Sequence, residues 1–403
     1  MAVAGGEHAQ GRTEWLVAGG FALLAGLVYF FSHPAARTPY DQTFLIAGQF
    51  LDLQLGIDHP RPWLELVPGE KLHYSVFPLG AVLTMLPAAV AARLGWIGEI
   101  PVSAVAAFIG AAIAYFAYRL SAGRGIVRTQ RLLLAAFPVF GSWVWANVEN
   151  GGAWQLALGF AVVGEMGALY YSLVDRRPLL AGAFFALAFG NRTELILLTP
   201  LFLGLLFAEP QSRRDARTGM ARLAAFCTVP FALGVATLVY NAMRFHSPFD
   251  FGYERIPFLL DDPFYAEGFF SWRGVEPNLR AMLLLPWASQ DSFPWIRPTG
   301  GGESIFLVSP ILLLCFRPRS RNARHSIFAV LAIVALTAVL WLHGNAGGYQ
   351  FSYRYGMILI PFFFWILLES SPPRPRIPDV LLLALSVFLN AYAVYAFYWY
   401  KIV

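Results

Sequence analysis

A carboxylate that follows the first apolar run has the chemistry of a general base. Asp41 stands directly after Tyr40, in the polar interval 32–74 that follows an apolar run at 15–31. A general base needs a carboxylate or imidazole within hydrogen-bond reach of an acceptor hydroxyl or amine. The apolar residues after Asp41 predict a short surface helix, so the same aspartate could instead cap that helix. The sequence leaves both interpretations open.

Two arginines stand beside the starts of apolar runs and could bind a phosphate. Arg192 precedes the run 194–208, and Arg354 lies at the start of the run 353–370. A guanidinium group offers two parallel N–H donors that match a phosphate. Each arginine could equally anchor its helix at the membrane interface or pair with a nearby carboxylate, such as Glu194 for Arg192.

A glycine-rich turn precedes Arg354, which stands between two tyrosines in the sequence. The segment 343–349 begins with His343, contains three glycines, and leads into Tyr353, Arg354 and Tyr355. Glycines allow the backbone to approach a ligand closely. An ordinary turn between helices would use the same residues, so the segment by itself does not decide between binding and connection.

The composition predicts that these residues are positioned by helices in a membrane. Hydrophobic residues make up 58% of the 403 residues and charged residues only 13%, against about a quarter charged in soluble domains. Apolar runs of about 20 residues match the thickness of a bilayer core. The runs lie at 15–31, 76–95, 101–119, 132–147, 153–174, 179–191, 194–208, 222–241, 303–316, 326–342, 353–370 and 378–398.

The sequence gives no indication of a cofactor. It contains no P-loop, no dinucleotide-binding glycine fingerprint and no zinc-ligand spacing, and Cys227 and Cys315 each fall inside an apolar run. We therefore expect no cofactor, and the residues do not support a divalent metal. The net charge of +5 comes almost wholly from arginines in short loops, so no nucleic-acid partner is expected.

The arginines predict which side of the membrane each loop faces. Five dense loops, at 119–131, 176–177, 213–222, 317–324 and 374–376, fall on every second connection, and the positive-inside rule places them in the cytoplasm. Arg12 places the N-terminus there too. The run 76–95 then cannot span, and we expect a juxtamembrane or re-entrant segment on the outer face, in which Pro78 and Pro87 fit a broken helix. The competing topology places the N-terminus outside and Asp41 in the cytoplasm.

These assignments predict an all-α polytopic membrane protein with about 11 transmembrane helices. The chain 1–403 forms one membrane domain, with a first outer loop at 32–100 that carries juxtamembrane helices and an aromatic-rich outer cap at 242–302. The runs 179–191 and 194–208 are expected to be two short helices that meet at the outer face. The alternative is one long helix that holds a buried charge pair.

One acidic residue lies in the middle of an apolar run. Glu165 stands between Gly164 and Gly167, and a carboxylate inside a membrane segment is a functional candidate by default. Because it is far from the outer helix ends, a structural hydrogen bond is the favoured interpretation.

The layout resembles the GT-C superfamily of polyprenyl-phosphate-dependent glycosyltransferases, especially bacterial family 39 enzymes akin to protein mannosyltransferases and aminoarabinose transferases. The features that carry the likeness are Tyr40-Asp41, the segment 73–78, Glu149, Arg192-Thr193-Glu194, the stretch 240–253 and Tyr353-Arg354-Tyr355. The chain departs from many relatives in having Asp41-Gln42 where they have two adjacent acids, and in lacking a large C-terminal soluble domain.

The resemblance implies a GT-C-like bundle that performs an inverting transfer of a sugar. The donor would be a polyprenyl-phosphate sugar, and the acceptor a glycan, lipid or protein on the outer face of a bacterial inner membrane. Asp41 would be the catalytic base, and Arg192 and Arg354 would hold the donor phosphate. The expected substrate contacts are Tyr40, His73, Tyr74, Glu149, Glu194, His343 and Tyr353.

Two other classes of protein fit parts of the pattern. A transporter or flippase of lipid-linked sugars would also be aromatic and polytopic, but it would carry polar residues through its midplane. A purely structural membrane subunit would not need acids and arginines concentrated at the outer helix ends.

Overall fold

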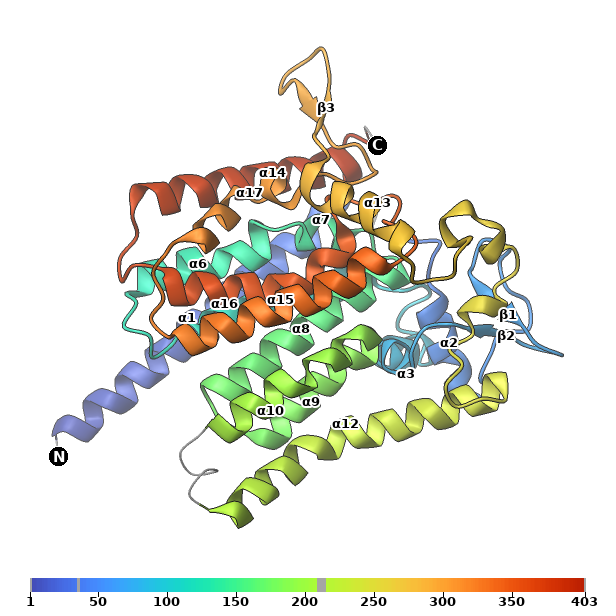
Figure 1. Ribbon diagram of the computed structural model, residues 1–403, viewed down its shortest axis with the longest axis horizontal. Helices are drawn as coiled ribbons and strands as arrows, with labels where there is room; N and C mark the ends of the chain where they lie inside the picture. Colours follow the sequence, from blue (N-terminus) through green and yellow to red (C-terminus); the bar gives the residue numbers. More distant parts are fainter. Residues whose placement is uncertain (1, 35–36, 209–214, 402–403) are drawn as a thin grey trace.

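The computed structural model describes residues 2–34, 37–208 and 215–401, with side chains from Thr13 onward. The helices run along a common direction and form one bundle. The N-terminal helix projects from one end of this bundle (Figure 1). Arg213, Arg214 and the side chain of Arg12, used above to predict the topology, lie outside the described residues.

Six of the described helices are long and apolar enough to cross a membrane. They are α1 (Ala2–Ser32), α5 (Val102–Leu120), α8 (Ala153–Leu173), α12 (Ala216–Phe245), α15 (Ala323–Leu342) and α17 (Ile377–Tyr398). The expected mostly helical, multi-pass architecture is confirmed at this level.

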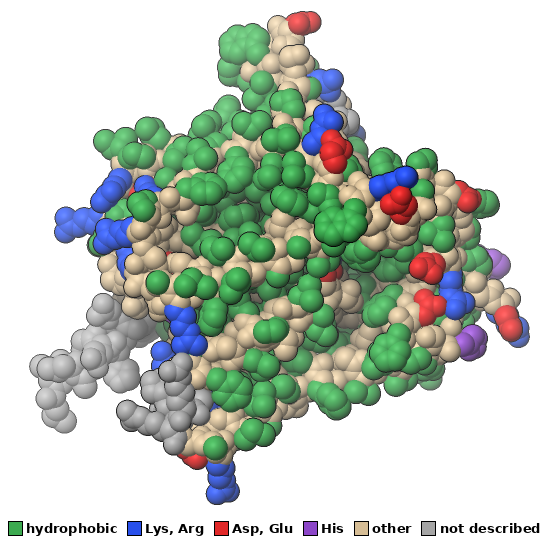
Figure 2. All heavy atoms as spheres, viewed as in Figure 1, with side chains coloured by type: hydrophobic (Ala, Val, Ile, Leu, Met, Phe, Trp, Pro, Cys, Tyr) green, Lys and Arg blue, Asp and Glu red, His purple; other side chains and the backbone are tan. Residues whose placement is uncertain are grey.

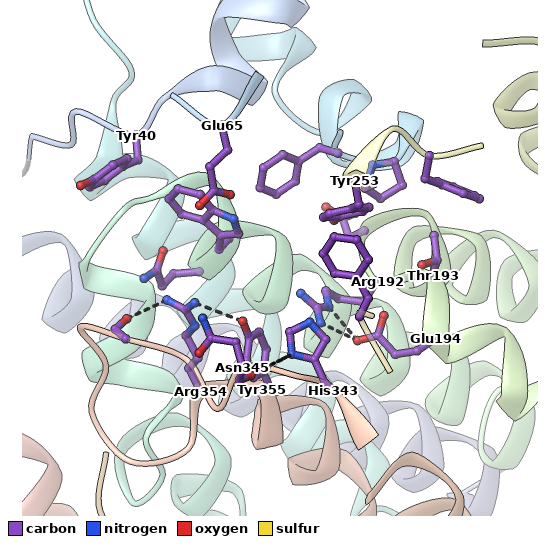
Figure 3. Close-up of a pocket in the computed structure, with 18 of the residues that line it drawn as sticks. Tyr40, Glu65, Arg192, Thr193, Glu194, Tyr253, His343, Asn345, Arg354 and Tyr355 are labelled. Atoms are coloured by element: carbon purple, nitrogen blue, oxygen red, sulfur yellow. Dashed lines mark hydrogen bonds and ion pairs between the residues drawn. The ribbon is translucent and has the colours of Figure 1, made fainter. Parts of the chain in front are cut away.

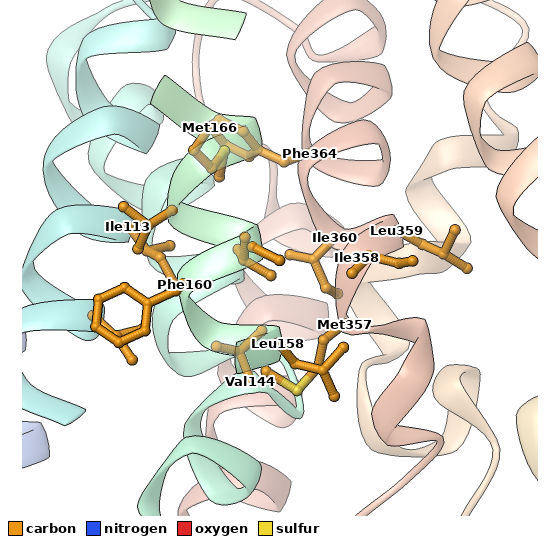
Figure 4. Close-up of a cluster of buried hydrophobic side chains, with 14 of the residues drawn as sticks. Ile113, Val144, Leu158, Phe160, Met166, Met357, Ile358, Leu359, Ile360 and Phe364 are labelled. Carbon is orange, nitrogen blue, oxygen red and sulfur yellow. The ribbon is translucent and has the colours of Figure 1, made fainter. Parts of the chain in front are cut away.

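Helix α8 lies at the centre of the bundle. Its apolar window is 83% buried, against 11% for α12 and 22% for α15, whose outward side chains are those of a lipid-facing surface. Gly164 lets α8 approach α9 (Pro178–Asn191) closely, because a Cβ there would lie 2.5 Å from the backbone nitrogen of Ala188. Figure 4 shows Leu158, Phe160 and Met166 of α8 packed among side chains from the neighbouring helices.

Basic loops gather at one end of the bundle, here named the arginine-rich end. Arg124 and His325 both pair with Glu369, at 3.5 and 3.1 Å. Arg131 pairs with Glu14 on α1. Figure 2 shows a broad hydrophobic band between this end and the opposite one, where charged side chains appear again. This separation is the charge pattern expected of a membrane-spanning bundle.

Several apolar runs form broken helices. The run 76–95 is divided into α3 (Leu79–Leu83), which Pro78 caps, and α4 (Leu86–Arg93), which has Pro87 in its first turn, so the expected break is confirmed. The runs at 179–208 form α9, the 3₁₀ helix η1 (Thr193–Leu198) and α10 (Thr199–Ala208), with Arg192 in extended conformation between them. The prediction of two short helices is therefore confirmed over one long helix.

The remaining membrane-side elements are also short or interrupted. They are α6 (Arg128–Phe140), α7 (Val144–Glu149), α14 (Ile305–Val308), η7 (Pro310–Phe316), η8 (Arg354–Leu359) and α16 (Ile360–Ser370). Gly141 ends α6, and Trp143 begins the turn into α7. The short elements η8 and α16 continue from one to the other, and they pack against α8 and α15.

The first loop folds back over the end of the bundle opposite the arginine-rich end. It contains α2 (Gln42–Leu51) and a hairpin of β1 (Leu66–Pro68) with β2 (His73–Ser75), in the antiparallel register Val67 to Tyr74. Arg244, near the end of α12, donates to the carbonyl oxygen of Ser75. This contact ties the hairpin to the end of α12.

The cap between α12 and α14 consists of short turns. It contains η2 (Tyr253–Arg255), η3 (Leu259–Asp261), η4 (Pro263–Tyr265), η5 (Trp272–Gly274), α13 (Val275–Leu279), the π-helical turn η6 (Arg280–Leu284), β3 (Ala288–Ser289) and β4 (Ile296–Arg297). Asn278 fixes α13 to the end of α15 by donating to the carbonyl oxygen of His343 at 2.6 Å. The β3–β4 hairpin stands out sideways from the bundle (Figure 1).

Candidate functional site

A cavity of about 1720 Å³ lies at the end of the bundle opposite the arginine-rich end. Its wall is built from the first loop, the start of α8, the α9–η1 junction, the cap, the turn after α15 and the end of α17. Figure 3 shows charged and aromatic side chains entering it from opposite sides. The charged and histidine side chains in the wall are His33, Arg37, Glu65, Arg192, Glu194, Asp250, Glu254, His343, Arg354 and Lys401.

Glu65 is the first-loop carboxylate that reaches into this cavity (Figure 3). It directly precedes β1, so the pairing of β1 with β2 fixes where its side chain points. Trp63 secures the same segment by donating from Nε1 to the carbonyl oxygen of Pro39 at 3.0 Å. Burial raises the pKa of Glu65, and the charge of Arg354 opposes that rise. A carboxyl with a raised pKa is better matched to proton transfer near neutral pH.

Asp41 lies just behind the cavity wall, and Tyr40 lies in it. The Asp41 side chain occupies the N-cap position of α2 but makes no capping hydrogen bond. Its Oδ1 instead accepts from Nη1 of Arg61 at 3.1 Å. Burial raises the pKa of Asp41, while Arg61 lowers it. This ion pair holds the segment that carries Trp63 and Glu65 against the start of α2.

Arg192 and Glu194 lie in the cavity wall and bind each other. Glu194 Oε1 accepts from Nε of Arg192 at 2.8 Å and lies 2.6 Å from its Nη2. The extended conformation of Arg192 between α9 and η1 allows this contact across one intervening residue. The guanidinium also lies 5.4 Å from the centroid of the Tyr355 ring. Much of the charge of Arg192 is therefore already balanced.

Arg354 reaches the same Tyr355 ring, at 5.0 Å from its centroid, but has neutral hydrogen-bond partners. Its Nη1 donates to the carbonyl oxygen of Gly348 at 3.0 Å, and its Nη2 donates to the Tyr355 hydroxyl at 3.2 Å. Its Nε is buried and lacks a hydrogen-bond partner in the described part of the chain. No ion pair within 4.0 Å joins Arg354 to a carboxylate among the described residues, which leaves its charge available to an anion.

Aromatic rings form the floor beneath the two arginines. His343 packs on Tyr355 at 5.3 Å and on Tyr265 at 6.1 Å between ring centroids. Its Nδ1 lies 2.8 Å from the carbonyl oxygen of Asn345, and burial lowers the pKa of the imidazole. Burial therefore favours the neutral form of the ring.

Four of the residues expected to contact substrate lie outside the cavity wall. His73 and Tyr74 belong to β2, where they pair with β1. Tyr353 is fully buried and donates from its hydroxyl to Asn278 Oδ1 at 2.7 Å. Glu149 is fully buried at the end of α7, and neither of its carboxylate oxygens has a described hydrogen-bond partner. Tyr40, Glu194 and His343 do line the cavity.

Sequence reasoning missed several residues that the fold brings to this wall. Trp154 meets Tyr40 with ring centroids 5.3 Å apart, and Tyr253 meets Phe269 at 5.8 Å. Glu65 could have been noticed as the one acid in the apolar stretch from Trp63 to Val67. The cap residues carry no comparable signal, because short irregular turns bring them to the cavity.

The described residues contain no group of three or more His, Cys, Asp or Glu side chains arranged to hold a metal ion. Comparisons with protein-family models, with curated proteins and with solved structures found no match for this chain. The assignment of a function therefore depends on the cavity itself.

Proposed function

We propose that this protein is an inverting glycosyltransferase that moves a sugar from a lipid-phosphate donor to an acceptor at the outer face of a bacterial inner membrane. The observation that carries the proposal is that Glu65 and Arg354 both line one large cavity beside apolar helices. Sugar transfer from a phosphate needs a base for the acceptor and a cation for the leaving group, and the two side chains have these properties.

Arg354 is the better of the two candidates for the donor phosphate. A phosphate attracts a guanidinium most strongly when no other anion already balances the charge. Arg192 is engaged by Glu194, whereas Arg354 donates only to neutral oxygens. We propose that Arg354 binds the phosphate and that Arg192, held by Glu194, supports the Tyr355 ring from the other side.

The apolar part of the wall suits the hydrocarbon chain of a lipid donor. Ile196 and Leu197 on η1 and Val339 and Leu340 on α15 line the cavity. Ile196 is 56% exposed and Leu197 46% exposed, so this part of the wall continues onto the outer surface of the bundle. A lipid could keep its chain beside these helices while its phosphate enters the cavity.

Two first-loop carboxylates compete for the role of base. The resemblance implies Asp41, while the cavity geometry favours Glu65, because Glu65 reaches the open space and Asp41 is paired with Arg61. In the proposed step the base takes the proton of the acceptor hydroxyl, and the acceptor oxygen attacks the anomeric carbon. The bond from that carbon to the phosphate oxygen breaks, and the lipid phosphate leaves against Arg354.

The finer topology belongs to the same proposal. About 11 transmembrane segments, with the arginine-rich end in the cytoplasm, would place the cavity at the outer face. In this arrangement α3 and α4 lie along the outer membrane surface. We propose no cofactor for the reaction.

A transporter of lipid-linked sugars is the alternative from another class. The cavity wall is made of residues from one end of the bundle, whereas transport needs access to both ends. Glu165, fully buried in α8 with no described hydrogen-bond partner, is the observation that keeps this alternative open, because such residues often serve ion or substrate pathways.

The deciding experiment incubates the purified protein with a panel of polyprenyl-phosphate sugars, with and without candidate acceptors. Release of free lipid phosphate that depends on Arg354 and on one of the two carboxylates would support the proposal. Binding without turnover, together with movement of the same lipid across liposome membranes, would reject it in favour of transport.

A further inference from the structure

The β3–β4 hairpin presents two aromatic side chains far from the core. Phe293 is 74% exposed and Trp295 is 63% exposed, at a tip that reaches away from the helices. Figure 1 shows the hairpin projecting across the direction of the helix axes rather than along it. Large exposed aromatic residues at such a tip normally mark a surface that contacts something else.

The base of the hairpin is fixed to α17 below the outer end of that helix. The hydroxyl of Tyr392 donates to the carbonyl oxygen of Ile296 at 2.6 Å. Trp287 stacks on Tyr392 at an interplanar angle of 25°. Since α17 ends at Tyr398, the attachment lies about 9 Å back along the helix at 1.5 Å per residue. The hairpin therefore leaves the bundle beside its apolar surface and does not rise from its end.

The surface next to the hairpin is apolar. On α17, Phe388 is 53% exposed and Tyr395 is 50% exposed, and Leu284, which precedes the hairpin, is 62% exposed. These positions lie along the flank of a helix that is long and apolar enough to cross a membrane. An exposed apolar helix flank of this kind packs against lipid. The hairpin therefore leaves the bundle at the boundary between lipid and water.

The hairpin itself has two chemically different sides. Figure 2 shows its hydrophobic side chains on the side toward the arginine-rich end and an acidic side chain at the apex on the other side. Asp291, in the same hairpin, is exposed. The hydrophobic side of the hairpin thus lies toward the apolar band of the bundle and its acidic side away from it, which is the orientation expected at a membrane interface.

Two hydrogen bonds pair backbone groups within the tip. Trp295 donates from its backbone nitrogen to the carbonyl oxygen of Ser292 at 2.7 Å, and Gln290 donates to the carbonyl oxygen of Trp295 at 3.1 Å. The strands below add the pairing of Ala288 with Arg297 and of Ser289 with Ile296. Paired backbone groups lower the cost of entering a region with little water.

We propose that the Phe293–Trp295 tip inserts into the boundary between headgroups and acyl chains of the outer leaflet, beside α17. The occupant of this surface is the membrane lipid. The hairpin is then a lateral anchor that fixes the depth and tilt of the neighbouring bundle end. This role does not depend on the proposed glycosyl transfer.

Electron paramagnetic resonance of a spin label tests the depth of the tip. The full-length protein, with Cys227→Ala and Cys315→Ala, carries one label through Phe293→Cys and is reconstituted in phospholipid nanodiscs. We expect collisions with oxygen to exceed collisions with a water-soluble nickel reagent at this site. A label at the exposed Glu70 of the first loop should show the opposite preference.

Two results would overturn the proposal. If the nickel reagent reaches position 293 as readily as position 70, the tip is in water. If neither reagent reaches it, another protein or a second copy of this chain covers the tip. A label introduced by Ser292→Cys, beside the tip and exposed, repeats the measurement should the Phe293→Cys protein not fold. In that case, thermal unfolding of each labelled protein confirms which variant is folded.

Discussion

At the scale of single residues, Arg354 and Arg192 share an aromatic ring but differ in what balances their charge. We expect Arg354→Ala to weaken binding of a polyprenyl-phosphate sugar roughly 10- to 100-fold, since hydrogen bonds to charged groups contribute about 1.5–3 kcal/mol. Arg354→Lys should recover part of this loss, because lysine keeps the positive charge. The recovery should be incomplete, because lysine lacks the two parallel N–H donors of the guanidinium group. Equilibrium binding of a labelled donor measures both variants.

The matched controls are Arg192→Ala and Arg273→Ala. Arg273 pairs with Glu267 on the exposed cap, and its removal should leave donor affinity unchanged. Arg192→Ala should have an intermediate effect, since Glu194 would be left without its partner. A larger loss for Arg192→Ala than for Arg354→Ala would reverse the assignment of the phosphate site.

The two first-loop carboxylates can be separated by their amide variants. If Glu65 is the base, Glu65→Gln should lower turnover 10²- to 10⁴-fold while donor binding survives, which is roughly the contribution of general base catalysis. Asp41→Asn should then lower turnover less, through loss of the Arg61 ion pair. Steady-state turnover with a defined donor and acceptor gives both values.

If Asp41→Asn lowers turnover more than Glu65→Gln does, Asp41 is the base, as the resemblance implies. Asp58→Asn is the control, because Asp58 is an exposed acid of the same loop. Near-normal turnover in both Asp41→Asn and Glu65→Gln would remove the first loop from the chemistry and direct attention to Glu194.

The raised pKa of Glu65 also predicts how the stability of the folded protein changes with pH. Because burial raises its pKa in the folded state, the folded protein holds this proton more tightly than the unfolded chain. Its contribution to stability is therefore favourable at low pH and is lost as the pH rises through the folded-state pKa. We expect Glu65→Gln to raise the thermal unfolding midpoint at pH 7 to 8 and to leave it nearly unchanged at pH 4. A lower midpoint at pH 7 would show that the charged form is stabilised.

At the scale of elements, a proline and a polar interruption in the apolar runs predicted where helices break. Pro87 correctly indicated the break between α3 and α4, whereas Pro78 stands at the start of α3, and the interruption around Arg192 correctly indicated two helices. The sequence also placed Arg354 and His343 beside a turn that forms part of the cavity. It could not place Glu65, because a β-hairpin pairing across the first loop sets the direction of that side chain.

The crossing of α3 over α9 depends on two glycines. A Cβ at Gly80 would lie 2.4 Å from the carbonyl oxygen of Gly190, so Gly80→Ala must separate the two helices. Overpacking of this kind costs about 1–3 kcal/mol, and we expect a lower thermal unfolding midpoint. Gly48→Ala on α2 is the control, because nothing lies within 4 Å of its Cβ and alanine favours a helix. Equal midpoints for both variants would contradict the close crossing.

At the scale of the molecule, the concentration of arginines at one end of the bundle predicts how the bundle is oriented in the membrane. Single cysteines introduced by Glu70→Cys and Trp96→Cys, in a background without Cys227 and Cys315, should react with an impermeant reagent added outside intact cells. Trp96 is 76% exposed, whereas Ser75 is fully buried and would report poorly. Labelling of position 96 only after permeabilisation would mean that α3 and α4 lead across the membrane.

The control for orientation is Ser320→Cys, in an exposed loop at the arginine-rich end. It should be labelled only after permeabilisation. Labelling of Ser320→Cys in intact cells, with protection of Glu70→Cys, would invert the expected orientation of the bundle and place the cavity in the cytoplasm.

The shortness of α9 has a consequence for the membrane around the cavity. Its 14 residues extend about 21 Å, while a bilayer core is about 30 Å thick. A hydrophobic segment shorter than the bilayer draws the two leaflets together locally. We expect the lipid beside α9 and α10 to be thinned, with its headgroups closer to the level of Arg192 and Arg354. If the proposed function holds, a lipid phosphate would enter the cavity by lateral diffusion, without first leaving the bilayer.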